Sequence, residues 1–325
     1  MSENYRMYDD RWRVDPTVTD QPYDVSTDFN VAHNIMDEIA TIINARPTLG
    51  QQMEHHTAYE MAQVVFGSNQ IERLGADLDE TKRLCMSIFR GDEGLEYVER
   101  SDEYQQKLDN FLLRRNKPGE KAIVRSRREV VQHAAAFQFM INAFVKQDEN
   151  MTETLIKETH AILTKGLSAE DAGFVSAAGF GGTYRSEHVF AGVSKMTKPA
   201  NIAGAMKSMI AQLQSDLAVV EATGHIDPFM LAATYCDRFI NIHPFKDANG
   251  RMCRIILNVI LVKYAGVVVP LGEKGEERDE YLAIAQESTR VAGHPGQLGT
   301  LVLAKASKGF KKMLNTLKRP SSEES

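Results

Sequence analysis

One stretch of sequence, a polar loop between two apolar helical segments, constrains this chain most. The residues before His243 repeat apolar side chains at helical spacing and begin with Asp-Pro, a pair typical of a helix start. Pro244 disfavours helix at the residue before it, because its ring clashes with that residue's backbone. The sequence therefore predicts a helix ending at His243, a short loop, and a second helix that begins near Gly250 or Arg251 and ends at Ala265-Gly266.

The rest of the chain repeats the helical period without any alternation of strands and helices, which favours an all-α fold. The exception is the glycine-rich segment between residues 173 and 199, where a short β-hairpin or irregular flap is expected. The other expected helices cover residues 31–43, 51–66, 130–144, 152–163 and 201–220.

Composition narrows the class of protein. A formal net charge of -6 argues against a general nucleic-acid binder, which needs a basic face. The three cysteines, Cys85, Cys236 and Cys253, are widely spaced and odd in number, so we expect reduced thiols and a cytoplasmic protein. The apolar run from Ile255 to Leu271 is interrupted by polar residues, so it predicts a core helix and no membrane span.

The loop and the start of the second helix carry the elements of an anion site. The free N–H groups and the dipole of a helix N-terminus attract negative charge. Arg251 and Arg254 are three residues apart, so both guanidinium groups can reach the same phosphates. Arginines with this spacing are usually solvated, but here the helix around them is apolar. Burying two cations without an anionic partner is costly.

Two further side chains supply the other groups that phosphoryl transfer needs, a metal ligand and a proton acceptor. Asp247 offers one carboxylate beside the anion site, and Mg²⁺ is commonly held by one or two carboxylates together with substrate phosphates. His243 can accept a proton near neutral pH. Such reactions depend mostly on positioning and charge stabilisation. A histidine before a proline is by itself more often structural than catalytic. The phosphoryl-transfer hypothesis therefore rests on the occurrence of the histidine, the aspartate and the two arginines together.

The stretch His243-Pro-Phe-Lys-Asp-Ala-Asn-Gly-Arg-Met-Cys-Arg254 closely resembles the Fic motif, H-P-F-x-[DE]-[GA]-N-G-R-x-x-R. Thr183-Tyr-Arg185 and the following Val189 resemble the segment before the family's target-docking flap. The resemblance covers roughly residues 126–315 and implies a Fic-type helical core with a short β-hairpin flap.

Fic proteins are typically AMP transferases that move AMP from ATP to a hydroxyl of a protein. The resemblance implies that His243 is the general base for a Ser, Thr or Tyr hydroxyl and that Asp247 binds Mg²⁺. Arg254 would hold the γ phosphate. The α and β phosphates would contact Asn249, Gly250 and Arg251. Ala248 replaces the commoner glycine, which the turn tolerates if its backbone angles are ordinary.

A second match concerns regulation. Ser68-Asn-Gln-Ile-Glu72 resembles the family's inhibitory motif, [ST]-x-x-x-E-[GN], in which the glutamate pairs with the second motif arginine, here Arg254. Arg73 departs from the expected Gly or Asn. The position of the match implies an inhibitory helix that precedes the core.

The expected domain organisation follows. Its parts are a loosely ordered lead-in (1–30), an N-terminal helical region with the inhibitory motif (31–125), the catalytic core (126–315) and a polar tail (316–325).

Several alternatives stay open. Glu72 could position a water for AMP removal, alone or in a bifunctional enzyme, or the chain could be a non-catalytic nucleotide-binding protein. The target, which could be the protein itself, is expected to pair with the flap by strand addition. The flap residues are Glu187, His188, Val189 and Phe190. Self-association into a homodimer is a further option. The basic residues 308–319 favour a surface helix end over a membrane anchor.

Overall fold

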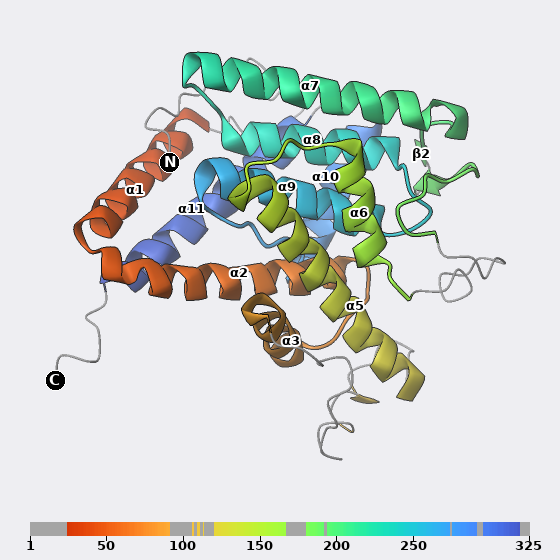
Figure 1. The fold of residues 1–325 in the computed structure, drawn as a ribbon, viewed down its shortest axis with the longest axis horizontal. Coiled ribbons are helices and arrows are strands. Elements are labelled where there is room, and N and C mark those ends of the chain that lie inside the picture. The colour runs from red at the N-terminus through yellow and green to blue at the C-terminus, as the bar shows by residue number, and fades with distance from the viewer. Residues whose placement is uncertain are drawn as a thin grey trace.

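A computed structural model describes residues 25–91, 120–166, 180–191, 194–273, 275–290 and 295–318, with four single positions between residues 91 and 120. The described chain is almost entirely helical, which confirms the all-α prediction (Figure 1). Its α-helices are α1 (Val25–Ala45), α2 (Gly50–Ile71), α3 (Leu78–Arg90), α5 (Glu120–Met140), α6 (Glu153–Leu163), α7 (Ile202–Thr223), α8 (Pro228–Ile242), α9 (Asn249–Ala265), α10 (Gly275–Arg290) and α11 (Gly296–Lys318). Shorter helical turns are η2 (Pro47–Leu49), the π-helix η4 (Ile141–Lys146) and η5 (Pro199–Asn201).

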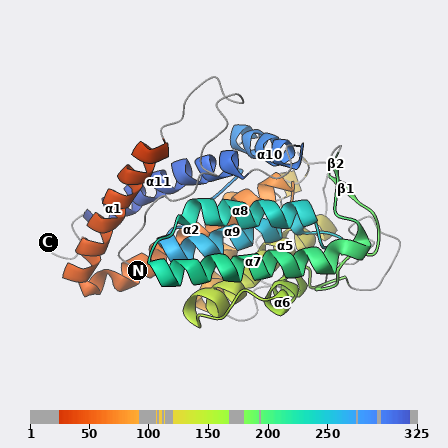
Figure 2. The same cartoon turned by 90° about the horizontal axis from the view of Figure 1, so that it is seen from above.

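Helices α8 and α9 form the predicted helix–loop–helix at the centre of the molecule (Figure 2). The carboxylate of Asp227 accepts hydrogen bonds from the backbone N–H groups of Phe229 and Met230, which caps α8, and Pro228 occupies its first turn. Helix α9 ends at Gly266, whose φ of 65° is left-handed, as helix ends favour. Helix α9 begins at Asn249, within a residue or two of the expected start.

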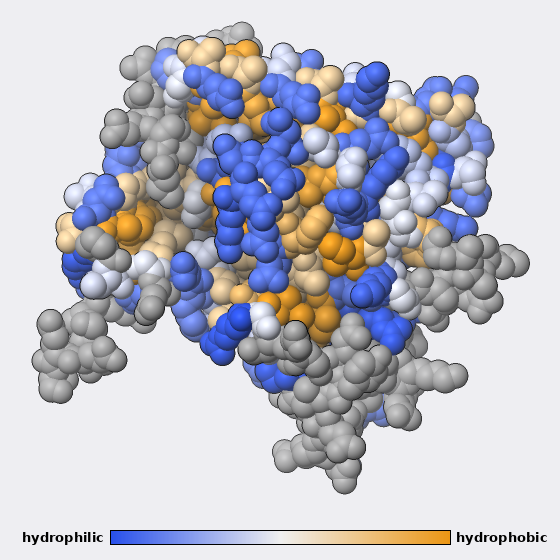
Figure 3. All heavy atoms as spheres, in the orientation of Figure 1, coloured by the Kyte–Doolittle hydropathy of each residue, from blue (hydrophilic) through white to orange (hydrophobic). Residues whose placement is uncertain are grey.

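Helix α9 is buried on every side over residues 251–261, which confirms that the apolar run 255–271 belongs to the core. Asn258, which interrupts this run, donates to the carbonyl of Val269 and accepts from its N–H at 2.7 Å. The polar residue therefore pins the returning chain against α9. Among the described residues, no helix is long and apolar enough to cross a membrane. Figure 3 shows hydrophilic and hydrophobic side chains interspersed over the viewed face.

Helices α1 and α11 pack together at one end of the molecule (Figures 1 and 2). Helix α1 begins at Val25, so the lead-in expected to extend to residue 30 is shorter than predicted. The physical reason is tertiary, because Phe29 is buried edge-to-face against Phe229. Helix α11 runs to Lys318, past the expected start of the polar tail, because Leu317 is buried.

The segment expected to form a flap is described in part. Strands β1 (Phe190–Ala191) and β2 (Ser194–Lys195) pair antiparallel, with Phe190 opposite Lys195. An isolated antiparallel bridge joins Tyr184 to Phe245 in the α8–α9 loop. Residues 167–179 and 192–193 lie outside the described residues. The strand pair lies beside the end of the bundle where α8 ends and α9 begins (Figure 2).

Part of the basic stretch 91–128, whose dense charge by itself predicts a solvated face, is buried. Arg127 on α5 is 8% exposed and pairs with Glu80 of α3 at 3.3 Å. Arg83 reaches the same carboxylate at 2.8 Å. The Arg127–Glu80 pair joins α5 to α3, and Arg83 supports the same carboxylate from within α3, so charge in this stretch serves the packing of the N-terminal helices. Residues 114–119 lie outside the described residues.

Candidate functional site

The loop between α8 and α9 presents His243 in a conformation that a helix cannot provide. His243 ends α8 with φ 52° and ψ 59°, in the left-handed region. Pro244 prevents the helix from continuing, as the sequence predicts. The backbone N–H of His243 still donates to Phe239 O at 3.0 Å, as the last bond of α8. The ring is half-buried.

The ring of His243 is suited to accept a proton. Its Nδ1 lies 3.3 Å from the carbonyl of Ile240, an acceptor, so Nδ1 carries the proton and Nε2 keeps its lone pair. Burial lowers its pKa below the ordinary 6.5, and Arg185 lowers it further. The Ile240 carbonyl, Glu72 and Asp247 act in the opposite direction. The neutral form therefore predominates near neutral pH.

Asn249 closes the loop through its side chain. Its Oδ1 accepts from Phe245 N at 2.9 Å and its Nδ2 donates to Phe245 O at 2.8 Å. In this arrangement the amide side chain holds the loop, whereas the resemblance assigns Asn249 to phosphate. Ala248 has a φ of 61°, in the left-handed region. The sequence predicts that the turn tolerates alanine in place of glycine if the backbone angles are ordinary, and this condition is not met. An L-residue in this region costs about 1–2 kcal/mol, and the loop bears that strain.

Arg185 joins the segment before the strand pair to the loop between α8 and α9. The buried guanidinium donates to the carbonyls of His243 at 2.7 Å and Thr197 at 2.6 Å. It also donates to Glu187 O at 2.7 Å, and its backbone N–H donates to Pro244 O. One side chain thus fixes the candidate base relative to the flap. The sequence marked Arg185 only as part of the Thr183-Tyr-Arg185 resemblance.

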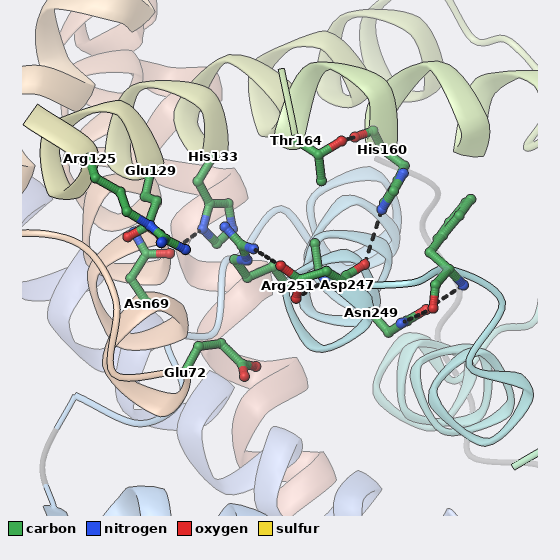
Figure 4. Close-up of polar contacts among 12 residues, drawn as sticks. Asn69, Glu72, Arg125, Glu129, His133, His160, Thr164, Asp247, Asn249 and Arg251 are labelled. Carbon is green, nitrogen blue, oxygen red and sulfur yellow. Dashed lines mark hydrogen bonds and ion pairs between the residues drawn. The ribbon is translucent and has the colours of Figure 1, made fainter. Parts of the chain in front are cut away.

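His160 of α6 supports the loop from the opposite side and carried no signal in the sequence. Its ring stacks on Phe245 with centroids 3.7 Å apart, and its Nε2 donates to Asp247 O at 3.1 Å (Figure 4). Gly182 N donates to its Nδ1 at 2.9 Å. Burial lowers its pKa to about 4, so the ring is neutral and serves to position Asp247.

Arg254 is buried and meets the two ends of the inhibitory motif. Its Nε donates to Ser68 Oγ at 2.8 Å, and its Nη2 donates to Glu72 Oε1 at 2.6 Å. Burial works to lower the pKa of Arg254, but Glu72, with Tyr281 and Cys253, raises it above its ordinary value. The structure thus brings together residues that the sequence separates by more than 180 positions.

Glu72 also occupies the N-terminus of α9. A Cβ built on Gly250 would lie 2.2 Å from Glu72 Oε1 and 3.2 Å from Arg254 Nη1. Only a glycine at this position lets the carboxylate approach the first turn of the helix so closely. The carboxylate therefore lies where the helix dipole and the free N–H groups attract an anion.

The end of α2 explains the odd residue in the inhibitory motif. Leu74 N donates to Asn69 O at 2.8 Å and Arg73 N to Gln70 O at 3.1 Å, the two bonds of a Schellman motif. Its left-handed position falls on Arg73, with φ 55°. Glycine and asparagine favour that position. Arg73 adopts the same geometry, and Glu72 still faces Arg254.

Arg251 differs from Arg254 in its surroundings. It is 1% exposed, and its Nη2 lies 3.7 Å from Asp247 Oδ2. Its Nε and Nη1 are buried and have no hydrogen-bond partner among the described residues. A buried cation with two unpartnered donors is costly unless an anion approaches it. Together with the start of α9, these donors have the chemistry to bind an anion.

Asp247 supplies a single carboxylate, so it could hold Mg²⁺ only if phosphates supplied further ligands. Its carboxylate is 38% exposed, and its Oδ1 accepts from Ala248 N at 2.6 Å. Among the described residues, no group of three or more His, Cys, Asp or Glu side chains forms a metal cage. Mg²⁺ needs no such cage when substrate phosphates and waters supply the other ligands, so the donor set fits Mg²⁺ bound with a nucleotide.

The expected flap residues are less closely held than the loop. Glu187 Oε1 lies 3.5 Å from Lys246 Nζ, and Met196 N donates to Val189 O at 3.4 Å. His188 is exposed. The backbone of Phe190 is part of β1. Glu187 thus lies beside the loop that carries His243, and the role of these residues in target docking stays a prediction.

The fold and the site define a helical protein with a neutral histidine on a loop and two buried arginines at the start of the helix that follows. Residues 150–261 match the model of the Fic/DOC family, so the chain contains a Fic domain, as the sequence motif indicates.

Relatives agree with this assignment. A Fido domain-containing protein of Dictyostelium discoideum is 29% identical over 137 residues, which are 42% of this chain and 93% of that protein. Protein adenylyltransferase fic-1 of Caenorhabditis elegans is 27% identical over 163 residues, 49% of this chain. That match spans only 28% of the nematode protein.

Solved structures share the fold at low identity. A Fic domain-containing signaling protein from Bacteroides thetaiotaomicron superimposes with a TM-score of 0.63 at 18% identity, covering 89% of this chain and 100% of that one. Residues 134–508 of C. elegans Fic-1 superimpose with a TM-score of 0.60 at 18% identity, covering 90% of this chain and 73% of that one. These likenesses extend the shared fold to the helices outside the matched domain.

Proposed function

We propose that the protein is an adenylyltransferase that transfers AMP from ATP to a hydroxyl of a target protein and that Glu72 inhibits it. The observation that carries the proposal is the site at the start of α9, where Arg251 has buried unpartnered donors and Arg254 is paired with Glu72. The Fic domain and the adenylyltransferase named among the relatives support a transferase acting on a nucleotide.

Each site residue has a role in this proposal. Nε2 of His243 accepts the proton of the target hydroxyl, whose oxygen attacks the α phosphate of ATP and displaces pyrophosphate. The N-terminus of α9, Gly250 and Arg251 bind the α and β phosphates, and Arg254 binds the γ phosphate. Asn249 keeps the loop closed so that these groups converge.

Asp247 would hold Mg²⁺ together with the phosphates, and the ion would neutralise charge on the pyrophosphate leaving group. The contacts of Asp247 support this role. His160 fixes its carbonyl, and Ala248 N and Arg251 fix its carboxylate.

Autoinhibition follows from competition for one cation. Arg254 Nη2 donates to Glu72 Oε1 at 2.6 Å, and the carboxylate lies against Gly250. A γ phosphate seated on Arg254 would meet the negative charge of Glu72, so ATP binds productively only when Glu72 withdraws. The buried Ser68, which accepts from the same arginine, adds to the cost of withdrawal.

The test is intact mass spectrometry of purified protein incubated with ATP and Mg²⁺. We expect added AMP on Glu72→Gly and little on the wild-type protein. His243→Ala in the Glu72→Gly background should abolish the addition. Glu149→Gly, which changes an exposed glutamate outside the site, is the matched control and should behave as wild type. If Glu72→Gly neither gains AMP itself nor transfers AMP to any protein tested with it, the proposal is overturned.

A second candidate reaction is AMP removal. The Glu72 side chain is 36% exposed and lies within the site, so it could orient a water toward a bound phosphoester. Purified Glu72→Gly protein that carries AMP provides the substrate. AMP released from it by the wild-type protein, and not by a Glu72→Gln variant, would support removal as a second activity.

A further inference from the structure

Behind the anion site, three buried polar groups from three helices lie together. Asn69 of α2 is 1% exposed, His133 of α5 is fully buried, and Arg251 of α9 is 1% exposed. Asn69 Oδ1 and His133 Nδ1 are 2.9 Å apart. Figure 4 shows the ring of His133 between Asn69 and the guanidinium of Arg251. The charge of Arg251 acts on the ring, since it helps to lower the pKa of His133.

The contact with Asn69 determines which ring nitrogen of His133 carries the proton. An amide oxygen only accepts, so Nδ1 must donate to it. Burial and the two arginines, Arg251 and Arg254, keep the ring neutral. Nε2 is therefore a bare acceptor, and it has no hydrogen-bond partner among the described residues. Nε and Nη1 of Arg251, which are donors only, are also buried without a partner.

We propose that His133 is a positioning residue for the phosphate site, in which its Nε2 lone pair orients the buried guanidinium of Arg251. Asn69 holds the imidazole in the tautomer that does so. The proposal rests on the proposed function only in that Arg251 binds nucleotide phosphate.

A neutral acceptor suits this task better than a carboxylate. Asp247 Oδ2 already lies 3.7 Å from Arg251 Nη2, and a second acidic side chain beside the guanidinium would compete further with phosphate, as Glu72 competes at Arg254. The neutral imidazole fixes the direction of the guanidinium without adding negative charge beside it.

The arrangement connects the inhibitory segment to both arginines. Ser68 and Glu72 hold Arg254 directly, and Asn69, between them in sequence, holds Arg251 through His133. Gly75, just after the segment, donates to Glu129 Oε2 at 3.2 Å, which ties the same loop to α5. A movement of α2 that frees Arg254 would therefore also change the support of Arg251.

Two amide substitutions separate this role from simple bracing of α2 against α5. The oxygen of Gln can take the place of Nε2, whereas the shorter Asn places its polar atom near Nδ1. His133→Asn can keep the contact with Asn69 but loses the acceptor that faces Arg251. His133→Gln keeps that acceptor and loses the contact with Asn69. Both are made in the Glu72→Gly background, and thermal denaturation checks that they fold.

The readouts are the Kd of Mg·ATP from calorimetry and, for AMP transfer, KM and kcat separately. We expect His133→Asn to weaken ATP binding and raise KM about tenfold, which corresponds to ~1.4 kcal/mol, with a smaller change in kcat. His133→Gln should recover most of that loss. Recovery by Asn and not by Gln, or equal affinity in all three proteins, would overturn the proposal.

A measurement on the unmutated protein keeps the inference independent of transfer. The ¹⁵N shifts of the His133 ring, assigned by their loss in His133→Gln, should show a protonated Nδ1 and a bare Nε2. A ring protonated at Nε2 would overturn the proposal whatever the kinetics of the variants. Failure of Glu72→Gly to transfer AMP while it binds Mg·ATP would count against the proposed function and leave the positioning role intact.

Discussion

Glu72 Oε1 and Arg254 Nη2 meet at 2.6 Å, although 182 residues separate them in the sequence. The guanidinium is 3% exposed and the carboxylate 36% exposed, so one partner is part of the core and the other can reach solvent. A buried cation needs a partner at all times, whereas a half-exposed carboxylate can leave at moderate cost. The asymmetry suits exchange of Glu72 for a phosphate.

The first prediction concerns stability. Glu72→Gln keeps the volume of the side chain and removes its charge, so Arg254 loses its carboxylate partner. We expect the free energy of unfolding to fall by about 1–2 kcal/mol, less than for a fully buried pair because Glu72 is partly exposed. Urea denaturation measures the change. Saturating Mg·ATP should stabilise the variant more than the wild type, and equal stabilisation of both would contradict competition at Arg254.

The second prediction concerns the approach of Glu72 to Gly250. In Gly250→Ala the new Cβ would lie 2.2 Å from Glu72 Oε1, so the carboxylate must move. The substitution should destabilise the wild-type protein but cost much less in the Glu72→Gly background. A double-mutant cycle should give a coupling energy of about 1–2 kcal/mol. Additive effects would show that the two positions do not meet.

The third prediction concerns the strained turn of the loop. Ala248 has φ 61°, and glycine adopts this angle without steric cost. We expect Ala248→Gly to raise the free energy of unfolding by about 0.5–1 kcal/mol. Gly224 at the end of α7 is the matched control, since its φ is 66° and nothing crowds it. Gly224→Ala should destabilise by a similar amount, and changes of the same sign in both variants would refute the explanation.

The fourth prediction concerns pH. The pKa of His243 is lowered by burial and by Arg185, so the ring stays neutral as the pH falls below 6.5. The acid limb of kcat/KM for Glu72→Gly should therefore have its midpoint below 6.5, because this parameter reports the free enzyme. Glu72 raises this pKa, so its removal shifts the limb in the same acidic direction. A midpoint above 6.5 would argue against His243 as the base.

Local rules of sequence accounted well for the ends of the central helices. Asp227 caps α8, Pro244 stops it and Gly266 ends α9, because each residue acts on backbone within one turn of itself. The same rules placed the start of α1 too late in the chain, because they do not include the packing of Phe29 against Phe229, which holds this residue in the helix. The division of the chain at residue 125 stays a prediction.

The site residues divide in the same way. His243, Asp247, Arg251 and Arg254 could be named from one short segment. His160 and His133 could not, because a lone histidine on a helix carries no sign of what another helix places against it. His160 meets Asp247 across 87 positions, and His133 meets Asn69 across 64.

The sequence by itself determined which reactive groups share one segment: a histidine, a carboxylate and two arginines within twelve residues, on a loop whose turns are set by local backbone preferences. The tertiary structure decided the partners of those groups. Packing of α2 and α5 against α9 placed Glu72 on Arg254 and His133 beside Arg251. The reason is physical, since buried charges and polar groups need partners, and only the packing of distant helices determines which partners lie within reach.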